Sequence, residues 1–217
     1  MLGVRFARRE PGEFKILCLG AHSDDIEIGC GGTVLRLLEE IPEAQVHWVV
    51  LGAGGKRGDE AVESANCFLA KAQRKEILVQ TFRDGFFPYV GGEIKQFFEY
   101  LKGVCQPDLV LTHFRDDRHQ DHRLVSDLTW NTYRNHCILE YEIPKYDGDL
   151  GAPNFFVPLS EPACREKIQT LLRCFRSQSD KSWFREDTFL SLLRMRGLEC
   201  NAPERYAEAF YSRKLVY

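Results

Sequence analysis

The chain has 217 residues, of which 44% are hydrophobic and 28% are charged. These proportions are close to those of globular proteins, and they exclude a disordered or collagen-like chain. With 29 Lys and Arg against 32 Asp and Glu, the formal net charge is -3, so the overall charge gives no reason to expect nucleic acid or an acidic membrane as a partner. The length suits a single domain over 1–217, with a core at about 14–140 and a different C-terminal part at about 141–217.

Eight cysteines are spread along the chain, without any C-x-x-C pair. This spacing disfavours a cysteine-rich zinc site. The first 15 residues contain no apolar segment typical of a signal peptide, and no apolar run approaches the ~20 residues of a membrane span. We therefore expect a cytoplasmic protein whose cysteines are reduced and act as small core residues.

Short β-rich runs alternate with helical patterns over the first two thirds of the chain. Strands are predicted at 16–19, 46–51, 77–82 and 109–112. Helices are predicted from the spacing of apolar residues at 33–40, 59–71 and 92–105. This alternation is typical of parallel strands joined by helical crossovers. The sequence therefore predicts an α/β fold with a mostly parallel sheet that is covered on both faces.

The pattern changes after about residue 138. Four prolines and two glycines between 141 and 162 indicate a loop-rich excursion, which contains a short strand at 154–157. A helix is predicted at 160–175, with Ser160 as its N-cap, and another at 186–196, which Gly197 is expected to end. The tail at 206–217 is apolar enough to pack on the core, but its pattern predicts no element.

Two polar segments directly follow predicted strands. The first is A21-H-S-D-D-I-E-I-G-C-G-G32, and the second is T112-H-F-R-D-D-R-H-Q-D-H122. In a doubly wound sheet, ligands bind beyond the carboxyl ends of the strands. We therefore expect both segments at one edge of the sheet, where they face each other from elements about 90 residues apart.

Two histidines and an aspartate in these segments have the chemistry of a catalytic zinc site. His22, Asp25 and His122 could supply three ligands and leave the open fourth position that a catalytic zinc needs. Asp24 would then stand beside the open position, where it could take a proton from water that zinc has acidified.

Other side chains of the second segment could assist this chemistry. His119 can approach the same centre from the other side, to stabilise a developing oxyanion or to protonate a leaving group. Asp121 could orient His119 or a ligating histidine, and His113 is a candidate substrate contact. The string G29-C-G-G-T33 is not G-x-G-x-x-G, so no dinucleotide site is expected.

The pair AHSDDIEIGCGG and H-Q-D-H resembles the motifs A-H-P-D-D-E and H-P-D-H of the LmbE/PIG-L family of zinc-dependent N-acetylglucosamine deacetylases. The resemblance implies a Rossmann-like three-layer sandwich and one zinc ion, with another divalent transition metal as an alternative. It also implies removal of an acetyl group from an amino sugar. The residues that match the family's functional positions are the metal ligands His22, Asp25 and His122, the general base Asp24, and His119 with the orienting carboxylate Asp121.

The resemblance extends to candidate substrate contacts. Ser23 and Gln120 replace the motif prolines at positions that supply no ligand. The segment after the second strand is similar to the family's G-x-x-R-x-x-E region, which implies substrate contact for Arg57, and Asp84 matches a family position after the third strand. Four basic residues either hold an anionic part of the substrate or are surface charges: Arg57, Arg115, Arg118 and Lys145.

We therefore expect zinc-dependent hydrolysis of the acetamide of an N-acetylated amino sugar, either an N-acetylglucosamine-type conjugate or a nucleotide- or lipid-linked sugar. Two alternatives stay open: a phosphoesterase with two metal ions ~4 Å apart, and a non-catalytic binding protein on the same fold. One tightly bound zinc favours the deacetylase, and two Mn or Mg ions favour the phosphoesterase. The expected partner is a small-molecule sugar, without nucleic acid or a membrane span, and the sequence specifies no oligomeric state.

Overall fold

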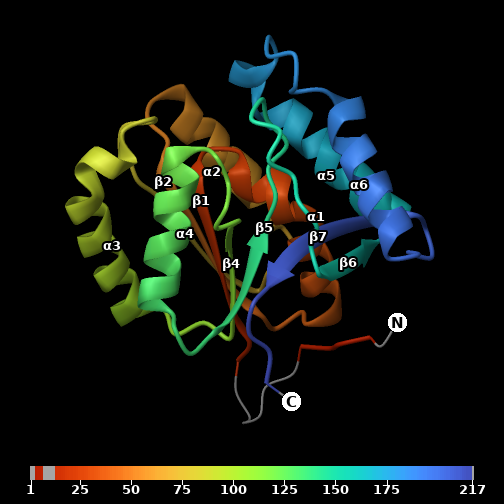
Figure 1. Ribbon diagram of the computed structural model, residues 1–217, viewed down its shortest axis with the longest axis horizontal. Helices are drawn as coiled ribbons and strands as arrows, with labels where there is room; N and C mark the ends of the chain where they lie inside the picture. Colours follow the sequence, from red (N-terminus) through yellow and green to blue (C-terminus); the bar gives the residue numbers. More distant parts are fainter. Residues whose placement is uncertain (1–2, 7–12, 217) are drawn as a thin grey trace.

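A single sheet runs through the computed structural model of the chain (Figure 1). The structure describes residues 3–6 and 13–216, so the prediction that the chain lacks a signal peptide falls largely outside the described residues. The strands are β1 Lys15–His22, β2 Gln45–Gly52, β3 Arg74–Val79, β4 Leu109–His113, β5 Cys137–Tyr141, β6 Phe155–Leu159 and β7 Tyr206–Ser212. Their spatial order is β3-β2-β1-β4-β5-β7-β6.

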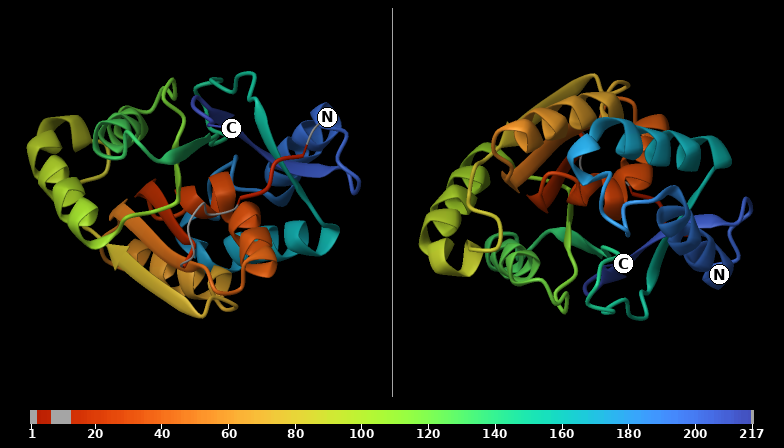
Figure 2. Two further views of the ribbon diagram at one scale, coloured as in Figure 1. Left: turned by 90° about the horizontal axis from the view of Figure 1, so that it is seen from below. Right: turned by 90° about the horizontal axis from the view of Figure 1, so that it is seen from above.

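Helices cover both faces of this sheet. They are α1 Asp25–Glu40, α2 Lys56–Phe68, α3 Gly91–Val104, α4 Gln120–Thr132, α5 Glu161–Cys174 and α6 Glu186–Glu199, with short 3-10 helices η1 Phe87–Val90 and η2 Arg176–Gln178. Helices α3 and α4 lie on one face and α1, α2 and α5 on the other, while α6 packs against β7 (Figures 1 and 2). None of the helices in the described ranges is long and apolar enough to cross a membrane.

The strand directions confirm the predicted α/β fold with a mostly parallel sheet. Strands β3, β2, β1, β4 and β5 are parallel, and β7 runs antiparallel to both β5 and β6. The chain switches sides of the sheet between β1 and β4, which pair directly through Ile16 and Leu109. At such a switch the connections diverge and leave a crevice beyond the carboxyl ends of the two strands.

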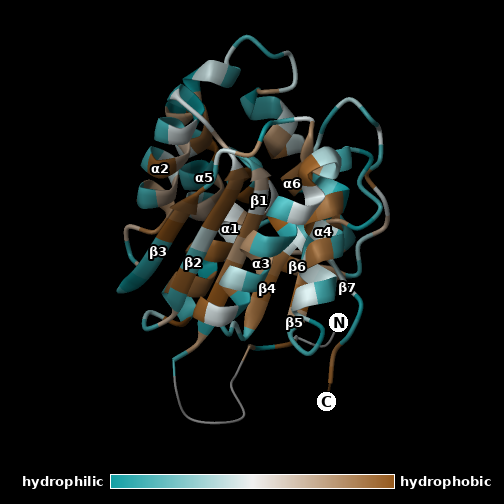
Figure 3. Cartoon of the chain, turned by 90° about the vertical axis from the view of Figure 1, so that its left-hand side faces the viewer, coloured by the Kyte–Doolittle hydropathy of each residue, from teal (hydrophilic) through white to brown (hydrophobic). Residues whose placement is uncertain are grey.

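The core forms two layers because alternate residues of each strand point to opposite faces. In β1, Ile16 and Cys18 belong to the cluster beneath α1, α2 and α5, whereas Leu17 and Leu19 belong to the cluster beneath α3 and α4. Figure 3 shows the apolar character of the central strands and the more polar surface of the helices. Burial on both faces holds the carboxyl ends of β1 and β4 in fixed positions.

Several elements differ from the sequence predictions. Helix α1 begins at Asp25, eight residues before the predicted start at residue 33, so the first motif occupies a helical turn. Helix α6 continues past Gly197 to Glu199, which makes the predicted stop wrong. A Cβ at Gly197 would lie 2.2 Å from the Arg205 carbonyl oxygen, so close packing of the backbone is what requires glycine there. Strands β5 and β7 and helix α4 were not predicted by pattern.

Candidate functional site

The two motif segments meet at the carboxyl ends of β1 and β4. His22 ends β1, Asp25 begins α1, and His122 lies in the first turn of α4. Three atoms, Nδ1 of His22, Oδ2 of Asp25 and Nε2 of His122, lie 3.2 to 3.5 Å from one another. All three residues are buried. The structure thus brings together the three side chains that the sequence places in the metal site.

The remaining nitrogen of each histidine faces a carboxylate. His22 Nε2 is 3.1 Å from Asp121 Oδ2, and His122 Nδ1 is 3.0 Å from Asp117 Oδ2. With a divalent cation bound, each carboxylate would accept the ring proton and leave the lone pair of the other nitrogen for the cation. Ligands ~2.1 Å from a tetrahedral zinc lie ~3.4 Å apart, which matches the 3.2 to 3.5 Å between these three atoms. The donor set therefore fits a divalent cation of the zinc type.

Side chains around these histidines form overlapping groups whose potential ligand atoms all lie within 4.8 Å of one another. The groups are His22, His119 and His122; His22, Asp84, His119 and Asp121; and Asp25, His113 and His122. In the second group the Asp121 carboxylate is already engaged. Its Oδ2 accepts from the Gly85 amide at 2.6 Å and its Oδ1 from the Phe87 amide at 3.1 Å. These bonds favour Asp121 as an orienting group for His22 over a ligand to a second metal ion.

Asp24 offers a buried carboxylate beside the cluster. It stands at the N-cap of α1, but its side chain makes no capping hydrogen bond. Its Oδ2 atom is buried without a hydrogen-bond partner among the described residues, and its Oδ1 lies 3.6 Å from Arg57 Nη2. Burial and the charge of Asp25 raise the pKa of Asp24 to about 6, although Arg57 acts in the opposite direction. A carboxylate with a pKa near neutrality is suited to accept and return a proton.

His119 caps helix α4 and faces His22. Its Nδ1 accepts a hydrogen bond from the Asp121 amide at 3.2 Å, so the proton of the neutral ring lies on Nε2. Burial lowers the pKa of His119. The ring is therefore a neutral N–H donor near pH 7. Asp121, predicted to orient His119 or a ligating histidine, contacts the ring of His22 through its carboxylate and His119 through its backbone amide.

Arg57 and Asp84 form a pair on the more open side of the site. Arg57 Nη1 donates to Asp84 Oδ2 at 2.8 Å, and Arg57 Nε donates to Ser23 Oγ at 3.1 Å. The Asp84 side chain is 51% exposed, and its Oδ1 lies 3.2 Å from His22 Nε2. Both predicted substrate contacts thus lie beside the cluster and are partly open to solvent.

His113, predicted as a substrate contact, is buried beside Asp25 and His122. It is fully buried, its Nε2 accepts from the Ala21 amide at 2.9 Å, and the same nitrogen lies 3.3 Å from Asp25 Oδ2. Its ring stacks on that of His122 at 4.0 Å between centroids. His113 therefore supports the cluster from the sheet and has no exposed surface with which to touch a substrate.

Asp117 and Lys145 both contact the site. The sequence left Lys145 either as a contact for an anionic part of the substrate or as a surface charge, and it gave Asp117 no part in the one-zinc site. Asp117 Oδ2 contacts His122 and also lies 2.9 Å from Lys145 Nζ. Lys145 Nζ is 2.7 Å from Asp149 Oδ1 as well, and its side chain is 11% exposed, so it is not free to hold an anionic part of a substrate. The position of Asp117, five residues before His122 and just ahead of a helix, was the available signal.

Comparison with known proteins shows the family of the chain that carries this site. The family model described as PIG-L, GlcNAc-PI de-N-acetylase, matches residues 17–133, which is more than half of the chain. The chain belongs to the PIG-L family. Both motif segments lie within the matched residues. A curated relative, the uncharacterized deacetylase YaiS of Escherichia coli (strain K12), is 29% identical over 136 residues, which cover 59% of this chain and 74% of that protein.

Solved structures agree with the PIG-L assignment at the level of the fold. The conserved protein TT1542 from Thermus thermophilus has a TM-score of 0.74 and 21% identity, over 93% of this chain and 96% of that one. The N,N'-diacetylchitobiose deacetylase from Pyrococcus horikoshii, solved with its inhibitor MPG, has a TM-score of 0.68 and 24% identity, over 92% of this chain and 83% of that one.

Proposed function

We propose that this PIG-L family protein hydrolyses the acetamide of an N-acetylated amino sugar with zinc as its metal, releasing acetate and a free amine. The observation that carries the proposal is a buried carboxylate oxygen of Asp24, which has no hydrogen-bond partner in the described part of the chain and lies beside the cluster of His22, Asp25 and His122. Membership of a de-N-acetylase family and the likeness to a chitobiose deacetylase support an N-acetyl sugar as the substrate.

The residues of the cluster would divide the chemistry between them. His22, Asp25 and His122 would hold the zinc ion, which when bound polarises the acetamide carbonyl and lowers the pKa of water. Asp24 Oδ2 takes a proton from the attacking water and returns it to the amine nitrogen as the C–N bond breaks. His119 donates its Nε2 proton in a hydrogen bond to the carbonyl oxygen, where negative charge develops.

The pair of Arg57 and Asp84 would hold the sugar. A guanidinium and a carboxylate offer donors and acceptors side by side, which matches sugar hydroxyls because each hydroxyl both donates and accepts. His113 would support His122 from the sheet, since its ring stacks on that of His122 at 4.0 Å between centroids.

The test is acetate release by zinc-loaded protein from N-acetylglucosamine, N,N'-diacetylchitobiose and a nucleotide-linked N-acetyl sugar. We expect turnover of at least one of them with one bound zinc per chain. Asp24→Asn should lower kcat by about 10²- to 10⁴-fold, the usual contribution of a general base, while zinc stoichiometry is unchanged.

Two outcomes would replace the proposal. Two bound Mn or Mg ions and phosphate release from a phosphomonoester, without amide hydrolysis, would make the protein a phosphoesterase. Sugar binding that is equal in the wild type and the Asp24→Asn variant, without acetate release from any substrate, would make it a binding protein.

A further inference from the structure

Lys145 connects the loop after β5 to His122 through a single carboxylate. Its Nζ lies 2.9 Å from Asp117 Oδ2, and the same oxygen lies 3.0 Å from His122 Nδ1. The other oxygen of Asp117 accepts from the His119 amide at 2.8 Å. Asp117 is 2% exposed. This one buried carboxylate therefore fixes both the His122 ring and the backbone at His119.

The Lys145 ammonium lies between two carboxylates. Asp149 Oδ1 is 2.7 Å from Nζ, and Asp149 Oδ2 accepts from the Arg118 amide at 2.7 Å. Both carboxylates are poorly exposed, so water screens their charges weakly. Without the ammonium, Asp117 and Asp149 would repel each other across a small gap.

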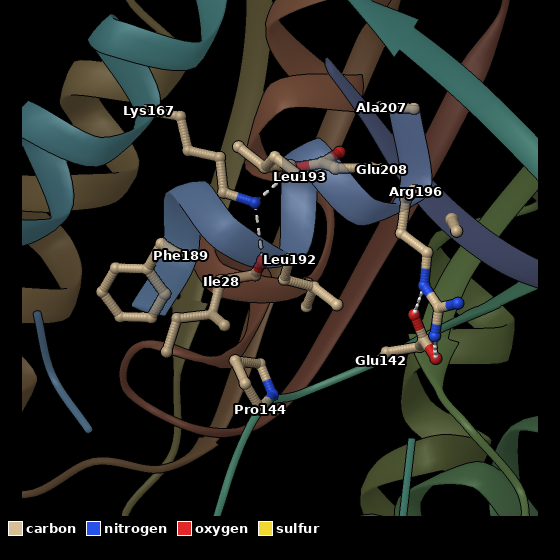
Figure 4. Close-up of a pocket in the computed structure, with 12 residues that line it drawn as sticks. Ile28, Glu142, Pro144, Lys167, Phe189, Leu192, Leu193, Arg196, Ala207 and Glu208 are labelled. Atoms are coloured by element: carbon tan, nitrogen blue, oxygen red, sulfur yellow. Dashed lines mark hydrogen bonds and ion pairs between the residues drawn. The ribbon is translucent and has the colours of Figure 1, made fainter. Parts of the chain in front are cut away.

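The backbone that carries Lys145 is itself anchored. Arg196 of α6 donates from Nε and Nη2 to the two oxygens of Glu142, at 2.9 and 2.7 Å (Figure 4). Arg196 Nη2 also donates to the Gly151 carbonyl at 3.1 Å. A single buried guanidinium therefore holds both sides of the segment that contains Lys145, and this limits how far Lys145 can move from Asp117.

We propose that Lys145 is a positioning residue of the metal site. Its ammonium holds Asp117 against His122 and thereby fixes the direction of His122 Nε2. This inference rests on the proposed function only in taking His122 as a metal ligand. It gives the loop after β5 a role in metal binding, in addition to any role in enclosing the substrate.

Removal of the ammonium should weaken zinc binding. In Lys145→Met, Asp117 and Asp149 face each other without a counterion, so Asp117 moves away from the His122 ring. Loss of a group that orients a ligand typically costs 10- to 100-fold in metal affinity, and we expect about tenfold here because Lys145 acts one contact further out. Lys145→Arg keeps the charge and should bind zinc within about threefold of the wild type.

The decisive variant combines two substitutions. Lys145→Met with Asp149→Asn removes the ammonium and also one of the two carboxylates that repel each other. If charge positions Asp117, this double variant should recover most of the zinc affinity that Lys145→Met loses. A role of Lys145 in packing alone would give no such recovery.

The experiment measures zinc affinity by competition with a chromophoric chelator, at one pH. The proteins are the wild type, Lys145→Met, Lys145→Gln, Lys145→Arg and the double variant, and the thermal midpoint of each metal-free protein checks folding. Lys71→Met is the matched control, because it breaks an exposed 2.8 Å ion pair with Glu39 away from the site and should leave the zinc affinity unchanged.

Zinc affinity of Lys145→Met and Lys145→Gln within about twofold of the wild type would overturn the inference. A loss that Asp149→Asn does not restore would overturn it equally. The comparison needs no substrate, so a wild-type protein that releases no acetate would refute the proposed function and still leave the role of Lys145 to be decided by these affinities.

Discussion

Glu208 Oε1 accepts a hydrogen bond from the Gly32 amide at 2.8 Å, across 176 residues of sequence. Glu208 Oε2 accepts from the Thr33 amide at 2.6 Å. Lys167 Nζ lies 2.5 Å from Glu208 Oε1 and donates to the Ile28 carbonyl at 2.6 Å (Figure 4). The last third of the chain therefore holds the middle of α1, the helix whose first turn carries Asp25.

The Lys167 and Glu208 pair should contribute strongly to stability only while both partners are present. Each residue is at most 3% exposed, and removal of one partner from a buried pair costs about 3–5 kcal/mol because the other charge is left uncompensated. We expect Lys167→Met and Glu208→Gln each to lower the free energy of unfolding in urea by about this amount. The double variant should lose less than the sum, and additive losses would show that the two charges do not stabilise each other.

Gly29→Ala should disturb the packing of Tyr141. A Cβ at Gly29 would lie 2.1 Å from Tyr141 Cδ2, and the Tyr141 hydroxyl donates to the Leu19 carbonyl at 2.6 Å. Overpacking of this kind typically costs about 1–3 kcal/mol. Gly103→Ala in α3 is the matched control, since no neighbouring atom lies within 4 Å of its Cβ, and it should stabilise the protein by up to about 1 kcal/mol. Urea unfolding of both variants measures the difference, and equal effects would contradict this account.

Asp121→Asn should weaken zinc binding by about 10- to 100-fold, as expected for the partner of a ligating histidine. The two oxygens of Asp121 accept from the Gly85 and Phe87 amides and face His22 Nε2. In the variant, the side-chain NH2 group would replace one of these oxygens. It would then face one of the N–H groups that the oxygen accepted from, and two donors cannot form a hydrogen bond. Chelator competition measures the affinity, with the exposed Asp127→Asn on the same helix as the control. Unchanged affinity would show that Asp121 does not orient His22.

Protonation of His47, a residue of β2 outside the site, should make the free energy of unfolding depend on pH. Burial lowers the pKa of His47, although Glu76, 3.1 Å away, opposes the shift. The folded protein therefore holds the neutral ring, whereas the unfolded chain takes up a proton below its ordinary pKa of about 6.5. The neutral His47 ring therefore contributes fully to the free energy of unfolding above about pH 6.5. This contribution is lost as the pH falls toward the lowered pKa of the folded state, and the free energy of unfolding then changes by at most about 1.4 kcal/mol per pH unit.

The measurement for His47 is urea unfolding between pH 8 and pH 5. His47→Gln cannot take up the proton, so its stability should fall less steeply than that of the wild type below about pH 6.5. Parallel curves for the two proteins would contradict the prediction. The comparison between variants cancels the titration of other groups.

The sequence determined the class of fold and the residues that meet at the site. Runs of β-forming residues predicted four strands. The spacing of apolar residues predicted the helices between them, because it reports which face of a helix is buried. The rule that ligands bind beyond the carboxyl ends of parallel strands then brought His22, Asp25 and His122 together, and the structure places their ligand atoms within 3.5 Å of one another.

Only the tertiary structure decided what each neighbouring side chain does. His113 and Lys145 carry residue types suited to substrate contact, yet one is buried under Asp25 and the other is held between Asp117 and Asp149. The sequence pattern did not predict strand β7, because this strand depends on pairing with β5 and β6, which are far away in the sequence. Periodicity describes the burial of an element along its own length, whereas hydrogen bonds and ion pairs between distant segments exist only after those segments have packed.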